Sequence, residues 1–261
     1  MPLFHAVAAG PAGTGVAVRV TYGIWALPAV AALLVWLPEL RFRTAPQAGG
    51  RSGVLAVARH ALAWQVMTFM GLQSLSYYAA LSWFPSLFRD HGISAVAAGN
   101  LLALMNAGNA VTALFVPVLA QRRTDQRALA AASVAAIIVG LAGSAFGPAS
   151  TVAGFVAVLG LGQGAAFGLS IFFFTARAAD GHAAAALSGF AQGGGYLIAA
   201  AGPVLVGVLR SVTGGWTVPV AVLLGIAGGQ LISGLLAGRH RLLSVGPAAA
   251  APVPTDAQAR P

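Results

Sequence analysis

Seven long apolar segments dominate the sequence, and they restrict the possible folds more than any other feature. Roughly 20 apolar residues in a helix cross a membrane core about 30 Å thick, because lipid offers no partner for free backbone groups. The predicted spans are residues 20–37, 61–88, 95–120, 128–147, 151–176, 184–209 and 216–238. Charged residues make up 7% of the chain, too few to cover a water-facing surface. The sequence therefore predicts an all-α membrane protein with about seven transmembrane helices.

The spans and the stretches between them predict five parts of the chain. The longest internal connection contains proline, glycine and arginine, and the end of the chain is low-complexity alanine and proline that cannot form a core. The expected parts are an outer N-terminal segment 1–19, a peripheral transmembrane helix 20–37, a cytoplasmic linker 38–60, a six-helix transmembrane bundle 61–238 and a disordered cytoplasmic tail 239–261.

The arginines indicate the orientation of the chain. Short cytoplasmic loops retain arginine and lysine, so the side of the membrane with more of them is cytoplasmic. The loops after the first, third, fifth and seventh predicted spans carry ten arginines, against three on the other side. We expect a multi-pass protein of a bacterial inner membrane with its N-terminus outside and its C-terminus in the cytoplasm. The net charge of +9 is then explained by topology, and no nucleic-acid partner is predicted.

Polar side chains lie near the midpoints of four predicted spans, where an unpaired polar group is costly. These candidate substrate-binding residues are Gln73, Tyr77, Asn106, Asn109, Gln163, Gln192 and Tyr196. Two pairs each place an amide and a phenol on one helical face at i, i+4 spacing: Gln73 with Tyr77, and Gln192 with Tyr196. Such groups suit a small polar or planar solute. The alternative is that they hydrogen-bond neighbouring helices, an interaction of about 1 kcal/mol in membranes.

Glycines at every fourth position predict close helix packing. Gly160, Gly164 and Gly168 form one stripe, and Gly189 with Gly193 repeats the spacing. Small residues at this spacing let two helix backbones approach each other in a membrane. We therefore expect both glycine faces to pack against neighbouring helices.

Several kinds of chemistry find no support in the sequence. The chain has no cysteine, and none of its five acidic residues or five histidines lies in the middle of a predicted span. A proton relay, a metal site or a catalytic acid and base pair would need such groups. We therefore expect no enzymatic activity and no metal or cofactor.

Three segments resemble a known family of transporters. They are GLQSLSYYAALSWFPSLFRDHGIS, GLGQGAAFGLS and LSGFAQGGGYLIAAAGPVLVGVLRSVTGGW. From about Trp25 to Arg241 the chain is similar to the C-terminal half of the cyanate and 2-nitroimidazole transporters of the major facilitator superfamily. The resemblance implies about twelve helices with the substrate between two six-helix halves. The cytoplasmic signature of that superfamily is recognisable as PVLAQRRTDQRAL, with Gln121 where an aspartate is expected.

Two functions remain open from the sequence. The first is secondary active transport of small organic solutes or anions, such as cyanate or nitroimidazoles, by a truncated C-terminal half. This hypothesis predicts the lipid bilayer, a small-molecule solute and either the missing N-terminal half or a second copy as partners. The second is a non-transporting membrane scaffold that packs against another helical membrane protein.

Overall fold

The computed structural model describes residues 13–38 and 50–244. The chain divides into two units, Met1–Gln47 and Ala48–Pro261. The first unit contains helix α2, Gly13–Trp36, which includes Pro28 and exposes large apolar side chains such as Leu27 and Leu33. The helix begins ahead of the predicted span, so the expected outer segment 1–19 is helical from Gly13; its first twelve residues lie outside the described residues.

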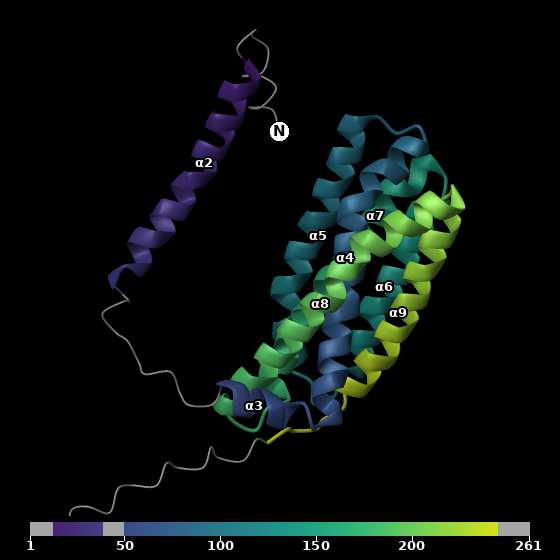
Figure 1. Ribbon diagram of the computed structural model, residues 1–261. Helices are drawn as coiled ribbons and strands as arrows, with labels where there is room; N and C mark the ends of the chain where they lie inside the picture. The colour runs from purple at the N-terminus through teal and green to yellow at the C-terminus, as the bar shows by residue number, and fades with distance from the viewer. Residues whose placement is uncertain (1–12, 39–49, 245–261) are drawn as a thin grey trace, which may run out of the picture. The chain divides into compact units, whose positions relative to one another are not determined.

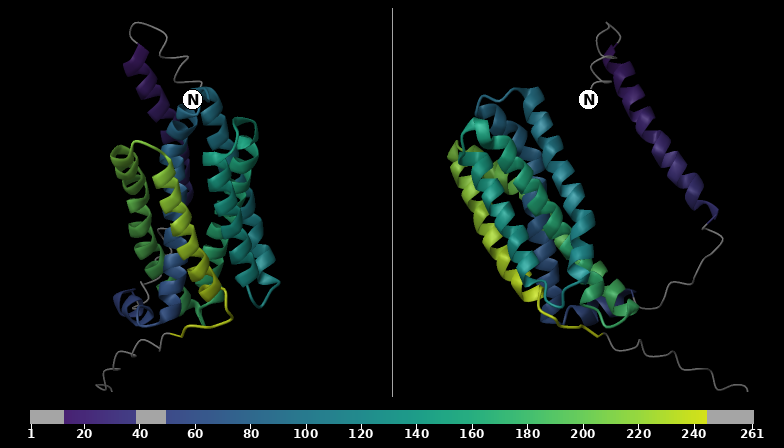
Figure 2. Two further views of the ribbon diagram at one scale, coloured as in Figure 1. Left: turned by 90° about the vertical axis from the view of Figure 1, so that its right-hand side faces the viewer. Right: turned by 180° about the vertical axis from the view of Figure 1, so that it is seen from behind.

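The second unit is a set of long helices that lie side by side along a common direction (Figures 1 and 2). Its elements are α3 (Gly50–Val57), α4 (Ala61–Asp90), α5 (Ala95–Gln121), α6 (Arg127–Phe146), η2 (Ala149–Thr151), α7 (Val152–Ala176), α8 (Gly181–Thr213) and α9 (Thr217–Ala237). Helix α4 packs against α5, α7, α8 and α9, whereas α5 is attached chiefly to α7. This arrangement makes α4 the central helix of the bundle.

All seven predicted spans coincide with helices, which confirms the all-α fold. Among the described residues, α5, α6, η2 with α7, α8 and α9 are long and apolar enough to cross a membrane. Helix α4 is 30 residues long but carries Gln73, Ser74, Ser76 and Tyr77 at its centre, which lowers its mean hydropathy. A helical membrane protein is therefore confirmed, and the number of seven spans stays a prediction.

The predicted linker 38–60 contains a helix that the sequence did not indicate. Residues 50–57 form α3, although glycines and an arginine make this stretch resemble a loop. Helix α3 buries Val57 and approaches α8, where a Cβ added to Gly53 would lie 3.3 Å from the Cβ of Ala186. Packing against α8 stabilises a helix that is too short to form alone. Residues 39–49 of the linker lie outside the described residues.

The first part of the predicted disordered tail is ordered, which corrects the expected boundary at residue 239. Leu243 is 2% exposed. Its backbone N–H donates to the carbonyl of Arg177 at 2.8 Å, and its own carbonyl accepts from the N–H of Ala179 at 2.9 Å. A buried leucine and two backbone hydrogen bonds hold this segment against the end of α7. Residues 245–261 lie outside the described residues.

The first glycine stripe packs α7 directly against α5, as predicted. A Cβ on Gly160, Gly164 or Gly168 would overlap the backbone of α5 at Met105, Asn109 and Ala113, respectively. These residues therefore permit contact between two helix backbones.

The second glycine pair does not pack within the bundle. Gly189 and Gly193 meet no neighbour among the described residues. Helix α8 instead approaches α4 through two other glycines: a Cβ on Gly202 would lie 2.5 Å from the carbonyl oxygen of Leu75, and Gly195 lies against Gly71. The i, i+4 glycine spacing therefore predicted the contact between α5 and α7. It did not predict the contact between α4 and α8, which uses Gly195 and Gly202.

Substitution of Gly164 by alanine tests the contact between α5 and α7. The added methyl group overlaps the Asn109 carbonyl and the Thr112 hydroxyl, and overpacking of this kind costs about 1–3 kcal/mol. Gly154 lies on the same helix with open space around it, so Gly154→Ala serves as the control. We expect Gly164→Ala to lower the free energy of unfolding in detergent, measured by SDS titration, and Gly154→Ala to preserve or raise it. Equal stability of the two variants would contradict the close contact between α5 and α7 at Gly164.

Candidate functional site

A pocket of about 180 Å³ lies midway along the bundle, between helices α4, α5, α7 and α8. Its lining residues are Gln73, Ser74, Tyr77, Tyr78, Asn109, Phe167 and Tyr196. Four of the seven predicted site residues line this pocket: Gln73, Tyr77, Asn109 and Tyr196. Helices α6 and α9 contribute no lining residue. Side chains from four helices thus converge at one depth of the bundle.

Gln73 and Gln163 join α4 to α7 beside the pocket. The Nε2 atom of Gln73 donates to Oε1 of Gln163 at 3.1 Å, and Nε2 of Gln163 donates to the Ser76 hydroxyl at 3.2 Å. The Ser74 hydroxyl donates to Oε1 of Gln73 at 3.1 Å. Gln163 is fully buried, at 0% exposure, and is not a lining residue. Its place is therefore in the helix contact, where it orients the Gln73 amide at the pocket wall.

Tyr77 and Asn106 make the corresponding link between α4 and α5. The Tyr77 hydroxyl donates to Oδ1 of Asn106 at 2.6 Å, and Nδ2 of Asn106 donates to the carbonyl of Leu102 at 2.9 Å. Asn106 thus supports Tyr77 without lining the pocket itself. The ring of Tyr77 packs edge to face against Tyr78 with centroids 5.4 Å apart, and the two rings form an aromatic wall.

Gln192 is the predicted site residue that the structure does not bring to the pocket or its hydrogen-bonded surroundings. Its Nε2 atom donates to the hydroxyl of Ser188 at 2.7 Å on the same helix. One helical turn separates Gln192 from Tyr196, which is enough to leave it outside the lining. Phe167 lines the pocket but was not predicted, because an aromatic residue in an apolar span is indistinguishable from a core residue.

The pocket offers hydrogen bonds and aromatic surface without charge. Amides come from Gln73 and Asn109, a hydroxyl from Ser74, and phenol groups from tyrosines on α4 and α8. Among the described residues no charged side chain lines it. These groups can bind a small polar or planar solute through several donors and acceptors at once.

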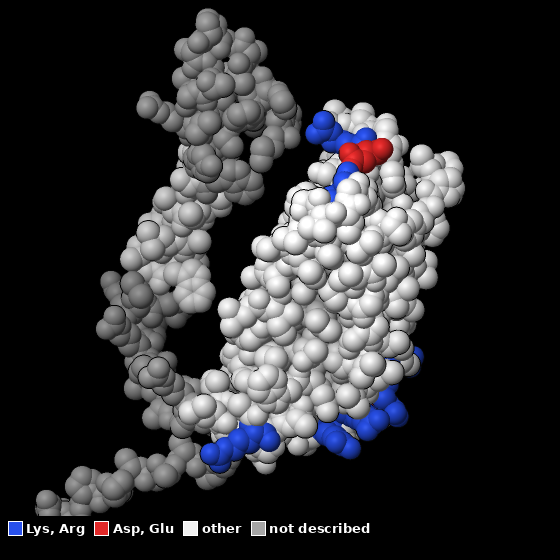
Figure 3. Space-filling model, turned by 45° about the vertical axis from the view of Figure 1, so that its right-hand side comes forward, with Lys and Arg blue, Asp and Glu red and all other residues white. Residues whose placement is uncertain are grey.

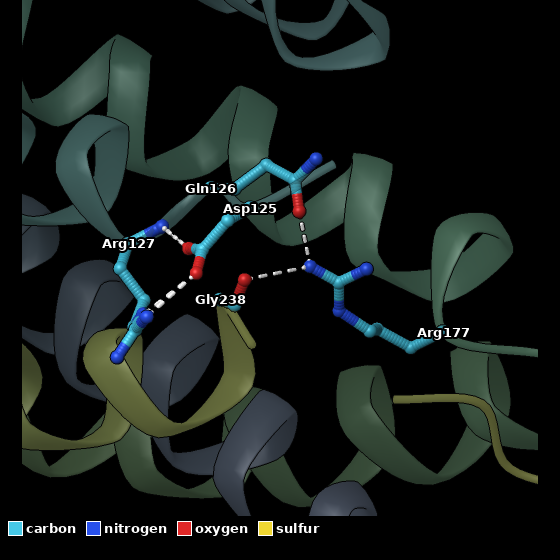
Figure 4. A network of polar contacts seen from close by, with 5 residues as sticks. All are labelled: Asp125, Gln126, Arg127, Arg177 and Gly238. Atoms are coloured by element: carbon cyan, nitrogen blue, oxygen red, sulfur yellow. Dashed lines mark hydrogen bonds and ion pairs between the residues drawn. The ribbon is translucent and has the colours of Figure 1, made fainter. Parts of the chain in front are cut away.

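A second polar network closes one end of the bundle around Arg177, which is 2% exposed (Figure 4). Its guanidinium group donates to the carbonyl oxygens of Ala237 at 2.8 Å and Gly238 at 3.0 Å, and also to Oε1 of Gln126. These carbonyl groups lie at the end of α9, where the helix itself supplies no partner, and the Gly238 carbonyl also accepts from the backbone N–H of Gln126. Arg177 therefore fastens the end of α7 to the end of α9 and to the segment before α6. The sequence indicated only a topological role for this arginine.

Asp125 lies beside this network and is paired with Arg127. Its carboxylate accepts from the Nε and backbone N–H of Arg127, both at 2.8 Å. These hydrogen bonds hold the pKa of Asp125 below its ordinary value. Burial lowers the pKa of Arg177, and the nearby Asp125 carboxylate opposes that shift. Gln121, at the position where an aspartate was expected, is exposed, and the network is built from Gln126 and Arg177 instead.

The opposite end of the bundle is held by a smaller exposed cluster. The Asp90 carboxylate accepts from Arg210 at 3.0 Å and from the indole N–H of Trp216 at 2.8 Å. The hydrogen bond from Trp216, followed by that from Arg210, lowers the pKa of Asp90. This cluster links the ends of α4 and α8 to the start of α9.

A bundle of long apolar helices around an uncharged polar pocket defines a polytopic membrane protein with a candidate solute site. Residues 2–203 match the Major Facilitator Superfamily. The chain belongs to this superfamily, whose members are membrane transporters rather than enzymes.

Three relatives show how far the similarity extends. The chain is 36% identical to the uncharacterized transporter YycB of Bacillus subtilis, over 84% of this chain and 55% of the relative. It is 38% identical to the 2-nitroimidazole transporter of Escherichia coli, over 80% and 54%. It is 33% identical to the cyanate transport protein CynX of Escherichia coli, over 75% and 51%. The chain thus spans about half the length of these relatives. No solved structure matches it.

Paired substitutions at Gln73 and Gln163 test the coupling beside the pocket. We expect Gln73→Leu or Gln163→Leu alone to lower the free energy of unfolding by about 1 kcal/mol, because each removes the hydrogen bond between the two buried amides. The double substitution removes both amides, and the remaining serines can bond to their own helix. Its stability in SDS titration should therefore lie near that of the unaltered chain. A double variant that loses the sum of both single effects would contradict the coupling.

Proposed function

We propose that the chain supplies the C-terminal six-helix half of a secondary transporter for small organic solutes or anions. The observation that carries this proposal is the pocket lined by α4, α5, α7 and α8. Membership of a transporter superfamily supports it, as does the chain's length of about half that of its relatives. In transporters of this kind, substrate sites lie near the bilayer midplane at the interface between repeats.

The lining indicates the class of solute. Amide and phenol groups beside an aromatic wall favour a planar molecule with several hydrogen-bonding atoms. Relatives named as a 2-nitroimidazole transporter and a cyanate transport protein support a small nitroaromatic or cyanate-like solute. An anion would need a positive charge from outside the described pocket, because no lining residue carries one.

The proposed transport mechanism requires a second bundle. Alternating access moves one bundle against another around a central site. Helices α5 and α8 expose large apolar side chains, among them Leu114, Phe115, Leu197 and Val204. The N-terminal half of a transporter, or a second copy of this chain, would supply the opposite wall of the site.

For the membrane location, we propose a bacterial inner membrane with the α5 to α6 loop in the cytoplasm. The support is the arginine bias, which places Arg122, Arg123 and Arg127 on the cytoplasmic side. The parts 38–60 and 239–261 lie on the same side in this arrangement, and residues 1–19 lie outside.

Accessibility of introduced cysteines tests this orientation, because the chain has none of its own. Thr124 lies in the loop between α5 and α6 and Ala149 in η2, and both are exposed. We expect Ala149→Cys to react with an impermeant thiol reagent in intact cells. Thr124→Cys should react only after the cells are opened. The reverse pattern would overturn the proposed orientation.

Uptake measurements test the transport function. Co-expression of the chain with the N-terminal half of the Escherichia coli 2-nitroimidazole transporter should give saturable uptake of 2-nitroimidazole. We expect the chain alone to give none, because one bundle cannot alternate access. Asn109→Leu and Tyr196→Phe should each raise the KM about three- to tenfold, since each removes a hydrogen-bonding group from the pocket wall.

The control for this experiment is Ile232→Ala on α9, an exposed position outside the pocket. It should leave both uptake and the amount of protein in the membrane unchanged. Uptake by the chain alone would indicate that a second copy completes the site. Absence of uptake in every combination, with both halves present in the membrane, would reject transport and favour a scaffold.

A further inference from the structure

We propose that five arginines at one end of the bundle form a binding surface for anionic phospholipid headgroups. The arginine surface consists of Arg122, Arg123, Arg127, Arg239 and Arg241. All five are exposed. Figure 3 shows basic side chains along the lower end of the bundle and others beside an acidic group at its upper end, with a long surface without charged groups between them.

Two segments far apart in the sequence build the arginine surface. The backbone N–H of Gln126 donates to the carbonyl of Gly238 at 3.1 Å. A Cβ on Gly238 would lie 2.9 Å from the backbone nitrogen of Arg127. The loop before α6 therefore touches the end of α9, and the buried guanidinium of Arg177 bonds to both segments. The orientation of the chain in the membrane depends only on which side the arginines lie on. It does not require the two segments to be in contact.

The charge of the arginine surface is largely uncompensated. Asp125 is the acidic residue within these two described segments, and its carboxylate is engaged by Arg127 at 2.8 Å. Asp180, which follows the Ala179 that donates to Leu243, is the acidic residue nearby in sequence to this contact, and its carboxylate accepts from the backbone N–H of Ala183. The five arginines of the surface thus outnumber these two acidic residues. Guanidinium groups bind phosphate oxygens through paired hydrogen bonds, and arginine is the residue that suits this geometry best.

Exposed apolar side chains beside the arginine surface favour a phospholipid over a soluble phosphate as its ligand. Leu242, which follows Arg241, is 60% exposed. Near the end of α5, Phe115, Val118 and Leu119 are also exposed. A phospholipid presents a phosphate and acyl chains together, so it can contact both kinds of surface at once.

A tryptophan at the same end of the bundle indicates that this end lies at the membrane surface. Trp64 lies at the start of α4, and its indole N–H donates to the carbonyl of Ala58 at 2.8 Å while half of the side chain is exposed. Tryptophan at the end of a membrane helix is typical of the headgroup region. The arginine surface therefore lies at the depth of lipid phosphates, where each arginine contributes about fivefold to the affinity for an anionic membrane.

Lipid binding by the purified full chain tests this proposal. The chain is titrated in neutral detergent with diphosphatidylglycerol or phosphatidylcholine, and bound lipid is counted by native mass spectrometry. We expect preferential binding of diphosphatidylglycerol that weakens as salt is raised. The double substitutions Arg122→Gln with Arg123→Gln, and Arg239→Gln with Arg241→Gln, should each reduce its affinity about 25-fold.

The control is Arg89→Gln, an exposed arginine at the opposite end of the bundle that takes no part in the Asp90 cluster. It should change the affinity by less than twofold. Because every substituted residue is at the surface, thermal unfolding verifies that the variants remain folded. Equal binding of the two lipids, or a loss of affinity of about fivefold in the control, would overturn the proposal.

Discussion

The backbones of α5 and α7 touch along Gly160, Gly164 and Gly168, and the polar side of α5 is positioned by this contact. Helix α5 has little other attachment to the bundle, because most of its surface is exposed. The contact is reinforced by the Thr112 hydroxyl, which donates to the carbonyl of Leu161 at 2.8 Å. With α5 fixed in this way, Asn106 reaches Tyr77 and Asn109 reaches the pocket. The three glycines of α7 thus determine where the site residues of α5 lie.

The two polar networks of the bundle differ in charge according to their depth. Halfway along the helices, Gln73 and Gln163 satisfy each other without a charge, which suits a region where an ion is expensive. At the end of the helices, Arg177 is charged and buried but bonds to backbone carbonyls and to Gln126. Carbonyl groups that lack partners at the end of a helix favour a cation there. The arginine therefore stabilises the end of α9 at a depth where its charge is tolerated.

Much of the fold was predictable from the sequence, because the length and hydropathy of a membrane helix are local properties. The depth of polar residues within their spans identified four pocket residues, including Asn109 and Tyr196. The rotation of each helix about its axis was not predictable, since it depends on tertiary packing. For this reason Gly189 with Gly193 was predicted to pack closely, whereas the contact of α8 with α4 uses Gly195 and Gly202. Gln192 was assigned to the site because it shares a helical face with Tyr196, but it lies one turn further along the axis. Arg177 looked like a loop charge because its partners, apart from Gln126, are backbone atoms.

The hydrogen bond between Gln73 and Gln163 joins residues 90 positions apart in the chain, and this separation has a consequence for biogenesis. Ribosomes add about 5–20 residues per second, so roughly 5–20 s pass between the synthesis of the two glutamines. During this interval the amide of α4 has no access to its partner on α7. Helix α4 is also the central helix, and its contacts with α8 and α9 form later still. Until α7 is made, the Ser74 hydroxyl on the same helix is the partner that the structure gives to the Gln73 amide oxygen.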